Sequence, residues 1–258
     1  MSSSRTETHP SLEEQIEQLK VQLAEAQKLT ALGELVGTTT HEFNNVLMTI
    51  LNYAKMGLRH SDDATREKAF TKILDAGQRA NKITNAVLGM ARNRSESFEP
   101  TDLVDLIENS LVLLEREMRK YRISVETEFA KQLPRALVNG NQIQQVLLNL
   151  LINARQAMPN GGRVIIRLTL DEEAQTVDLL VRDTGCGMPP EQLRRIFEPF
   201  FSTKAGPDET GKGGTGLGLA ACRDIIEAHR GRVRVESSVG RGTAFTIKLP
   251  AVVELAQV

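Results

Sequence analysis

His41-Glu42-Phe43-Asn44-Asn45 lies in the middle of a long helical pattern, and the rest of the chain is organised around this stretch. Apolar or near-apolar residues recur at alternating intervals of three and four, which is the spacing of a heptad seam. The seam residues are Leu29, Leu32, Val36, Thr39, Phe43, Val46, Ile50 and Tyr53. His41 lies two residues from its seam neighbours and should face outward, with Asn45 one turn later on the same face. This histidine, with Glu42 beside it, is a candidate nucleophile; a solvated histidine on a charged face is the alternative.

Length, composition and charge limit the class of protein. The chain has 258 residues, enough for one or two domains, and its net charge of −1 provides no basic field for nucleic acid. The longest apolar run, near residues 146–152, is too short to span a membrane, and residues 1–10 are polar without an apolar signal core. Cys186 and Cys222 have neither a disulfide pattern nor metal-ligand spacing. We therefore expect a cytoplasmic protein without membrane insertion and without a nucleic-acid partner.

Residues 11–30 carry apolar positions at the same four-three spacing, with Glu, Gln and Lys between them. This spacing predicts a short coiled coil after a disordered leader at residues 1–10, and a single amphipathic helix packed on its own domain is the alternative. The spacing slips between Ala26 and Leu35, and Gly33 and Gly37 lie in or just after the slip. The helix should therefore be weakest shortly before the histidine. The glycines indicate either a hinge or close helix packing.

A second helix is predicted after the polar stretch His60-Ser61-Asp62-Asp63, which offers turn and N-cap residues. Its apolar seam is Ala69, Ile73, Ala76, Ala80, Ile83, Val87 and Met90. Two long helices joined by a short polar loop form an antiparallel hairpin, here over residues 31–95. Because one hairpin cannot bury its seam alone, we expect a homodimer in which two hairpins pack as a four-helix bundle.

Residues 96–100 break the helical pattern and are expected to link the hairpin to a second domain at residues 101–251, followed by a tail at 252–258. This domain mixes helical and strand patterns. Helices are predicted at 102–120, 141–158, 190–196 and 217–229, and strands at 123–129, 164–170, 177–181, 233–236 and 244–249. Thr101 is the expected cap of the first of these helices. The order predicts an α+β sandwich with helices on one face of a mixed sheet.

Two polar motifs in the second domain are typical of nucleotide sites. Asn149 and Asn153 lie four residues apart on one face of an apolar helix, so their amides need partners, either a phosphate-bound metal or a neighbouring backbone. Asp183 follows a strand and can accept a hydrogen bond from an exocyclic amine such as that of adenine. Gly185 and Gly187 would let the backbone approach a flat ring. Each motif is weak when taken alone.

Two further motifs follow along the chain. Phe197-Glu198-Pro199-Phe200-Phe201-Ser202-Thr203-Lys204 is typical of a docking segment or of a hydrophobic anchor for a loop, and its lysine can meet a phosphate. Gly211-Lys212-Gly213-Gly214-Thr215-Gly216-Leu217-Gly218-Leu219 opens a helix, where N–H groups and the helix dipole favour an anion. It is not a Walker A loop, because no G-K-[ST] appears, and it is not a Rossmann turn, because no strand feeds it directly.

In this order and spacing, residues 29–250 resemble the sensor histidine kinases. His41-Glu42 matches the H box, and Asn149 to Ala154 matches the N box. Asp183 to Gly187 and Gly214 to Gly218 match the two glycine boxes. Phe197 to Phe201 matches the F box, and Gly240 to Phe245 matches the closing G-x-G-T-x-F turn. Val46 stands where the commonest H box has proline. The stretch is therefore similar to the H-[DE]-F-N-N branch of nitrogen-regulation-type kinases, and the helix should run straight past the histidine.

The resemblance implies that the second domain binds ATP and Mg²⁺, with the ATPase fold shared by topoisomerase, chaperone and mismatch-repair proteins. It implies that Asn153 ligates magnesium with support from Asn149, and that Asp183 holds the adenine amine. The implied base and phosphate pockets contain Gly185, Gly187, Gly214, Thr215, Gly216, Leu217 and Gly218, with residues 202–213 as a mobile lid. Either Lys204 or Lys212 would neutralise developing charge.

The resemblance also implies the reaction. His41 would take the γ-phosphoryl group of ATP, with Glu42 orienting its ring, and pass it to an aspartate of a response-regulator receiver domain. That partner would be a separate protein, because the chain has no receiver-like acidic cluster. Asn45 completes an E-x-x-[NT] pattern and would orient a water for phosphatase action on the regulator.

Other classes of function remain as alternatives. An ATPase-fold protein without histidine phosphorylation is one, and a non-catalytic dimeric scaffold is another. The segment before Leu29 is too short for a sensor domain, so a separate sensor protein at residues 11–37, a constitutive kinase and a truncated parent are all open. Phosphorylation within one chain or between chains is also open, since it depends on the handedness of the loop near Gly57.

Overall fold

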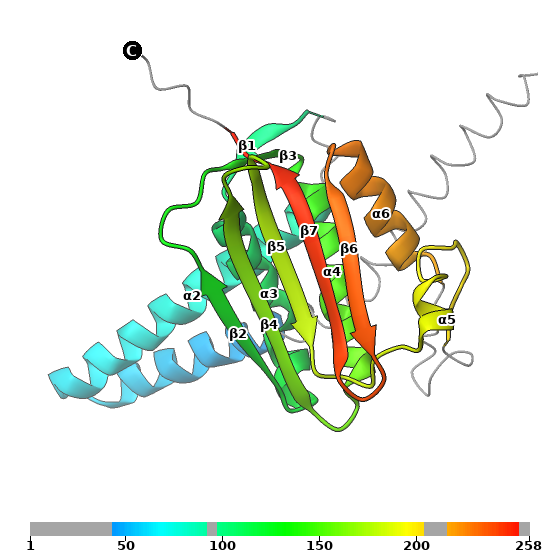
Figure 1. Cartoon of the computed structure of the whole chain (residues 1–258). Helices are drawn as coiled ribbons and strands as arrows, with labels where there is room; N and C mark the ends of the chain where they lie inside the picture. Colours follow the sequence, from blue (N-terminus) through cyan, green and yellow to red (C-terminus); the bar gives the residue numbers. More distant parts are fainter. Residues whose placement is uncertain (1–42, 92–96, 204–215, 253–258) are drawn as a thin grey trace, which may run out of the picture.

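The structure is a computed structural model that describes residues 43–91, 97–203 and 216–252. They form a helical hairpin that projects from an α/β domain (Figure 1). Among these residues, no helix combines the length and the apolar content needed to cross a membrane. The predicted coiled coil, the glycines at 33 and 37 and the seam residues before Phe43 lie outside the described ranges.

The hairpin contains a helix through residues 43–59 and the helix α2 (Asp63–Ala91), joined by a turn at residues 60–62. Asp62 caps α2, because its Oδ1 accepts the N–H of Thr65 at 2.8 Å and its backbone oxygen accepts the N–H of Arg66 at 3.1 Å. The hydrogen bond from Thr65 also lowers the pKa of the Asp62 carboxyl. The predicted hairpin and its polar turn are therefore confirmed, and Val46 lies inside an unbroken helix.

Only part of each predicted seam is buried within a single chain. Val46, Ala69, Ala76 and Ile83 are exposed by only 1–7%, and Val46, Ala76 and Ile83 join the same apolar cluster as the core of the α/β domain. The α/β domain therefore helps to bury part of the seam, while the seam residue Phe43 stays 40% exposed, so the expectation that one hairpin cannot bury its seam alone stays a prediction. A second apolar set stays 40–85% exposed. This outer stripe consists of Phe43, Leu47, Leu51, Leu58, Phe70 and Leu74.

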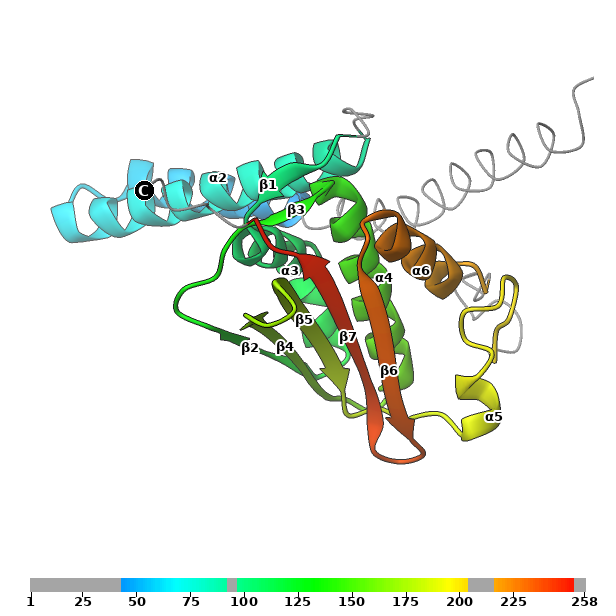
Figure 2. The same cartoon turned by 45° about the horizontal axis from the view of Figure 1, so that its top comes forward.

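The α/β domain is built on a mixed sheet whose strand order is β2-β4-β5-β7-β6. The strands are β2 (Ile123–Phe129), β4 (Gly162–Asp171), β5 (Thr176–Asp183), β6 (Arg232–Ser238) and β7 (Gly242–Pro250). β2 pairs with β4 in parallel, and the other neighbours are antiparallel. The helices are α3 (Leu103–Lys120), α4 (Gly140–Ala157), α5 (Pro190–Leu193) and α6 (Gly218–Ala228). Figures 1 and 2 show α3, α4 and α6 on the same face of the sheet, as the sequence predicted.

The core lies between that face of the sheet and the three helices. Alternate residues of β4 and β5 point into it, because successive side chains of a strand face opposite ways. The most buried of these strand residues include Val164, Ile166, Leu168, Val177 and Leu179, and α4 adds Ile143, Val146, Leu147 and Leu151. The apolar character of α4 that was evident in the sequence is thus explained by its position against the sheet.

Two details of the boundary between the regions differ from the sequence prediction. Glu99–Thr101, at the end of the predicted linker, forms strand β1 and pairs antiparallel with β3 (Ala136–Val138). The cap of α3 is Asp102, whose Oδ1 accepts the N–H groups of Val104 and Asp105 at 2.8 and 3.3 Å. The prediction of Thr101 as this cap was wrong, because its hydroxyl donates to the carbonyl oxygen of Glu99 instead, at 3.0 Å.

An ion pair joins the hairpin to the domain. Arg79 of α2 contacts Glu115 of α3, with 2.8 Å between Nη2 and Oε2, and the other oxygen of Glu115 contacts Arg119 at 2.8 Å. Both side chains of the Arg79–Glu115 pair are more than a third exposed, so the pair adds little stability by itself. Its contribution is to fix how α2 lies against α3.

Candidate functional site

Asp183 is the centre of the first group of polar residues. It is the last residue of β5 and is 4% exposed. Its Oδ1 accepts the backbone N–H groups of Gly185 at 2.8 Å and Thr243 at 3.2 Å. Burial raises the pKa of this carboxyl, and the two N–H donors act against that rise. Both hydrogen bonds go to Oδ1, so among the described residues Oδ2 stays available to accept from an amine.

The loop after Asp183 depends on its glycines for a reason that the sequence did not reveal. A Cβ on Gly185 would lie 2.7–2.8 Å from Ala157 and from Oδ1 of Asp183, and Gly187 has a φ of +66° with its backbone against the carbonyl oxygen of Ser238. Their lack of a side chain therefore allows close packing against α4 and β6. The loop is also held to α4 directly, since the N–H of Cys186 donates to the oxygen of Ala157 at 3.1 Å.

Two hydroxyl groups beside Asp183 were not assigned from the sequence. Ser237 and Thr243 face each other in the β6–β7 register, with 3.0 Å between their oxygens. Ser237 also accepts the N–H of Met188 at 2.9 Å. Thr243 belongs to the closing turn that the sequence singled out, so a signal existed for it. Ser237 carried none, because a single serine in a strand has no distinctive spacing and its partner Met188 is 49 residues away in the sequence.

The second group of polar residues lies where α4 meets the start of α6. The side-chain nitrogen of Asn149 donates to the carbonyl oxygen of Gly218 at 3.4 Å and lies 3.7 Å from the sulfur of Cys222. The alternative partner expected for this amide, a neighbouring backbone group, is therefore present. The thiol of Cys222 is buried, which raises its pKa to about 12 and keeps it protonated.

One face of α4 connects the two groups. Asn149, Asn153 and Ala157 follow at intervals of four, so they line one side of the helix. Asn149 contacts the start of α6, Ala157 contacts the loop after Asp183, and the half-buried Asn153 lies between them. Eight residues of helix span about 12 Å. Asn149, Asn153, the aspartate loop and the start of α6 thus lie along one face of α4.

The start of α6 provides the other end of this site. Leu217 precedes the helix without a side-chain cap, and Gly218 is its first residue. The first N–H groups of a helix lack partners inside it and attract anions. Gly216 has a φ of +68° and lies against the backbone of Phe200, where a side chain would collide. This end therefore has the chemistry expected of an anion site.

The aromatic segment beside α5 is only partly packed. The guanidinium of Arg195 lies 4.4 Å from the ring centre of Phe201, and that of Arg223 lies 5.7 Å from the ring centre of Phe197. Phe200 is 70% exposed and has a φ of +65°. Two of these rings therefore anchor the segment by cation–π contacts, while Phe200 presents its ring to solvent.

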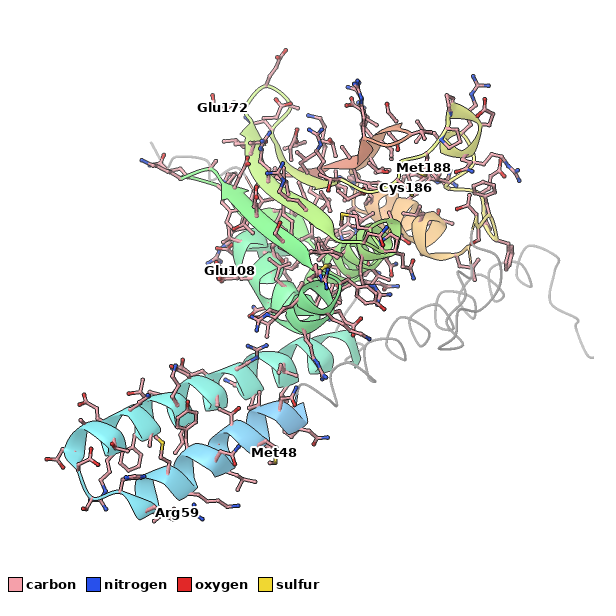
Figure 3. The ribbon with its side chains drawn as sticks, turned by 90° about the horizontal axis from the view of Figure 1, so that it is seen from below. Met48, Arg59, Glu108, Glu172, Cys186 and Met188 are labelled. Carbon is pink, nitrogen blue, oxygen red and sulfur yellow. The ribbon has the colours of Figure 1, made fainter. Side chains whose placement is uncertain are left out.

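Several predicted site residues fall outside the described ranges. These are His41, Glu42, Lys204, Lys212, Gly214 and Thr215, and most of the predicted lid at 202–213. Asn45 is described: it is exposed on the hairpin helix, and its backbone oxygen accepts the hydroxyl of Thr49 at 2.9 Å. Figure 3 shows Met48 on this helix and, in the α/β domain, Cys186 and Met188 on the side away from the hairpin tip at Arg59.

The metal prediction can be tested against the donors that are present. Within residues 43–91, 97–203 and 216–252, no group of three or more His, Cys, Asp or Glu side chains is placed to hold a metal ion. Magnesium commonly takes one or two protein oxygens, with phosphate oxygens and waters for the rest. The amide oxygen of Asn153, between the aspartate loop and the start of α6, fits that kind of site.

Comparisons with known proteins agree with this geometry. A family model described as "Histidine kinase-, DNA gyrase B-, and HSP90-like ATPase" matches residues 138–253, and one described as "His Kinase A (phospho-acceptor) domain" matches residues 31–96. The sensor kinase CckA of Brucella abortus is 36% identical over 252 residues, which are 92% of this chain and 26% of that protein. The curated relatives are longer: this chain spans about a quarter to about half of their lengths.

Two solved structures are similar as well. The catalytic domain of the histidine kinase ThkA is 31% identical, with a TM-score of 0.51 over 60% of this chain and 95% of that one. ThkA in complex with the response regulator protein TrrA is 27% identical, with a TM-score of 0.51 over 95% of this chain and 68% of that one.

Proposed function

Because this chain belongs to the sensor histidine kinases, we propose that it uses ATP to phosphorylate its own His41 and then passes the phosphoryl group to a response regulator. The observation that supports this most strongly is the face of α4 that runs from the aspartate loop to the start of α6. The carboxylate of Asp183, the amide of Asn153 and the first turn of α6 follow one another along this face, and that order supports binding of the amine, the magnesium-bound phosphates and the terminal phosphate of ATP.

In this proposal the base end is formed by Asp183, Gly185 and Gly187. The buried carboxylate of Asp183 accepts from the amine of adenine through Oδ2, because Oδ1 is already engaged by two backbone N–H groups. The two glycines keep the loop against α4 and β6, so the carboxylate is held before the ligand arrives.

The phosphate end is formed by the second glycine segment. Gly214, Thr215, Gly216, Leu217 and Gly218 offer backbone N–H groups to the phosphates, and either Lys204 or Lys212 supplies a positive charge. Asn153 donates its amide oxygen to Mg²⁺, which supplies charge neutralisation on the phosphates when bound. Asn149 holds the start of α6 in place through Gly218.

His41 acts as the nucleophile in this proposal. The unperturbed pKa of imidazole is about 6.5, so at neutral pH the ring is mostly uncharged and one nitrogen can attack. Glu42 accepts the proton of the other ring nitrogen and orients the ring. A bond forms between the histidine nitrogen and the γ-phosphorus, the bond to the bridging oxygen breaks, and ADP leaves. Transfer to the aspartate of a receiver domain then regenerates the free imidazole.

A homodimer is proposed from the outer stripe of the hairpin. Its six apolar side chains are too exposed for a surface that faces only water, and they run along both helices of one hairpin. A second copy of the hairpin would cover them in a four-helix bundle. Val46, Ala69, Ala76 and Ile83 are not needed for this contact, because they are already buried within one chain.

The finer assignments rest on the sequence. The H-E-F-N-N stretch supports assignment to the nitrogen-regulation-type branch. The proposed coil at residues 11–30 lies within the segment 11–37 at which a separate sensor protein would bind, with a constitutive kinase and a truncated parent as the alternatives. The hairpin at 31–95, the linker at 96–100 and the ATP-binding domain at 101–251 are the proposed domains. The response regulator is a separate protein, as it is for ThkA and TrrA.

Phosphatase activity toward the regulator is a second candidate function. The exposed amide of Asn45 supports it, since it lies on the hairpin surface one helical turn after His41. An amide at this place can hold a water in line with an aspartyl phosphate.

The decisive experiment is incubation with γ-labelled ATP and magnesium. Wild type should acquire label that is lost in acid and retained in base, as expected of a phosphohistidine. His41→Gln should acquire none, while His60→Gln, which changes the exposed histidine of the hairpin turn, should label like wild type.

The outcomes separate the alternatives. Absence of label on wild type, together with bound ATP, would favour the scaffold or a phosphatase without kinase activity. Label on His41→Gln would identify another acceptor. For the second function, Asn45→Ala should lose phosphatase activity and keep autophosphorylation, with the adjacent Asn44→Ala as control; unchanged phosphatase activity in Asn45→Ala would disprove the role.

A further inference from the structure

Ser237 occupies a central position beside the base end of the site. It lies on β6, and its hydroxyl oxygen makes three contacts with two other segments. The N–H of Met188 donates to it at 2.9 Å, the carbonyl oxygen of Gly242 lies at 3.0 Å, and the hydroxyl of Thr243 lies at 3.0 Å. All three distances are those of hydrogen bonds.

The number of protons decides the direction of each bond. A serine hydroxyl has one hydrogen to donate and two lone pairs to accept with. A carbonyl oxygen can only accept, so the contact with Gly242 requires the hydrogen of Ser237. Ser237 then accepts from Met188 and from Thr243. This is the only assignment in which all three contacts are hydrogen bonds at the same time.

The assignment leaves Thr243 without a hydrogen to offer. Its hydroxyl hydrogen points to Ser237, so its remaining lone pairs can only accept. Its backbone N–H is bonded to Oδ1 of Asp183 at 3.2 Å, which places it next to the carboxylate. Thr243 is 6% exposed, so bulk water does not compete freely for its hydroxyl. With its hydrogen directed to Ser237, this hydroxyl can serve as a second acceptor beside the carboxylate, and the two groups are called the acceptor patch below.

We propose that Ser237 is a positioning residue that fixes the hydroxyl of Thr243 as an acceptor and thereby makes the base end select purines with a 6-amino group over purines with a 6-oxo group. The inference rests on the proposed ATP site. An amine at position 6 offers hydrogens to both acceptors. An oxo group there would face lone pairs from Asp183 and Thr243 and find no donor.

Removal of the serine hydroxyl should change this selectivity. In Ser237→Ala, the hydroxyl of Thr243 loses its acceptor and can rotate to donate its hydrogen toward the ligand. A 6-oxo purine then gains one hydrogen bond that it lacked. Ser237→Thr keeps the hydroxyl and should keep the selectivity. Ser238→Ala is the matched control, because Ser238 is the next residue of the same strand and is exposed.

The test compares the affinities of ATP and ITP, which differ at position 6 and in the hydrogen on N1. Wild type should prefer ATP, and Ser237→Ala should reduce the ratio of the two dissociation constants about fivefold to tenfold, the value of one net hydrogen bond. Ser238→Ala and Ser237→Thr should keep the wild-type ratio. Isothermal titration with the full chain measures both constants, and thermal melting reports whether each variant is folded.

A second variant makes the test independent of how well Ser237→Ala folds. Thr243→Val removes this hydroxyl, so it should weaken ATP binding and lower the preference for ATP over ITP, because the amine loses one acceptor and the oxo group no longer faces the lone pairs of Thr243. In the Ser237→Ala, Thr243→Val double variant, the effect of the serine on the ratio should disappear, because its only route is through Thr243. An unchanged preference for ATP in a folded Thr243→Val variant would overturn the proposal.

The remaining outcomes are also distinct. Equal binding of ATP and ITP by wild type would overturn the acceptor patch, and an unchanged ratio in a folded Ser237→Ala would overturn the role of Ser237. Neither result would affect the proposed function as long as ATP binds. Failure of wild type to bind either nucleotide would instead contradict the ATP site itself.

Discussion

The hairpin and the α/β domain differ in what covers their apolar side chains. In the domain, Leu147, Ile166, Leu168, Leu179 and Ile226 are at most 1% exposed, and one chain supplies every surface that buries them. In the hairpin, only Val46, Ala69, Ala76 and Ile83 are buried, while the side chains of the outer stripe remain 40–85% exposed. Figure 1 shows the hairpin extending away from the domain, so the domain does not cover its tip.

The difference shows that the two regions depend on different partners for stability. Burying a leucine or phenylalanine completely is worth about 1.5–3 kcal/mol. The domain obtains this free energy within a single chain. The outer stripe can obtain it only from another surface, so the association state should alter the hairpin and leave the domain nearly unchanged.

The largest effect is expected from a cavity in the domain. Leu168→Ala removes a side chain that is fully buried in β4, and such changes cost about 2–5 kcal/mol of unfolding free energy. Denaturant unfolding measures the loss. Leu137→Ala, at a leucine of β3 that is 45% exposed, should cost far less. Equal losses would contradict the distribution of burial described above.

A charge on the outer stripe should break the association while leaving the domain intact. Phe70→Glu places a carboxylate in the proposed interface, where burying an unpaired charge costs several kcal/mol, so the dimer dissociation constant should rise about 100-fold or more. Sedimentation at several concentrations measures it. Lys68→Glu is the control, because position 68 lies about 200° around the helix from Phe70. If wild type is monomeric, no second copy covers the outer stripe, and the proposed difference in what stabilises the hairpin and the domain is wrong.

A pH-dependent effect near neutral pH is expected in the domain. His229 is 2% exposed and links α6 to the cap of α4: its Nε2 accepts the N–H of Asn139 at 2.9 Å, and its Nδ1 lies 2.7 Å from the oxygen of Ile225. Burial lowers the pKa of this imidazole below its ordinary value. The unfolded chain therefore binds a proton at a higher pH than the folded chain does.

The sign of the effect follows from this order of the two pKa values. The unfolding free energy should be constant above about pH 7 and fall as the pH drops through about 6.5, by up to about 1.4 kcal/mol per pH unit until the folded imidazole also titrates. His229→Gln should remove this part of the slope in pH-dependent unfolding curves. His60→Gln, at the exposed turn of the hairpin, should retain it.

The smallest effect is expected where the two regions meet. Glu115→Gln weakens the contacts with Arg79 and Arg119, and because these side chains are well exposed the unfolding free energy should fall by only about 0.5 kcal/mol or less. Hydrogen exchange should nevertheless rise in α2 near Arg79. The control is Glu128→Gln, which weakens the exposed pair with Arg167 on the sheet. Increased exchange in α2 for both variants would show that the pair does not hold the junction.

Much of the fold was predictable because its signals are local. The strand at 123–129 coincides with β2, and the other predicted helices and strands agree with the structure to within a few residues. Side-chain periods of two and 3.6 can be read without knowing the partners. The short strands β1 and β3 were missed, because each has three residues and is stable only through the other.

The residues of the candidate site also fall into two groups: those that the sequence revealed and those that only the structure revealed. Asp183, Asn149 and Asn153 were evident as polar side chains at the ends of apolar segments, and the structure joins them along α4. Ser237 gave no signal, because a serine in a strand has no distinctive spacing. Its importance comes from contacts with Met188 and Thr243, which the β6–β7 register and the loop after β5 bring to it.

The sequence by itself determined the order of the motifs, the hairpin and the class of the second domain, because periodicity and chain order do not depend on distant contacts. Only the tertiary structure decided the strand order β2-β4-β5-β7-β6, the cap at Asp102 and the difference between a buried seam and an outer stripe. These features depend on which segments meet in space. Apolar positions on one helix look alike in sequence, and packing alone decides which of them a single chain can bury.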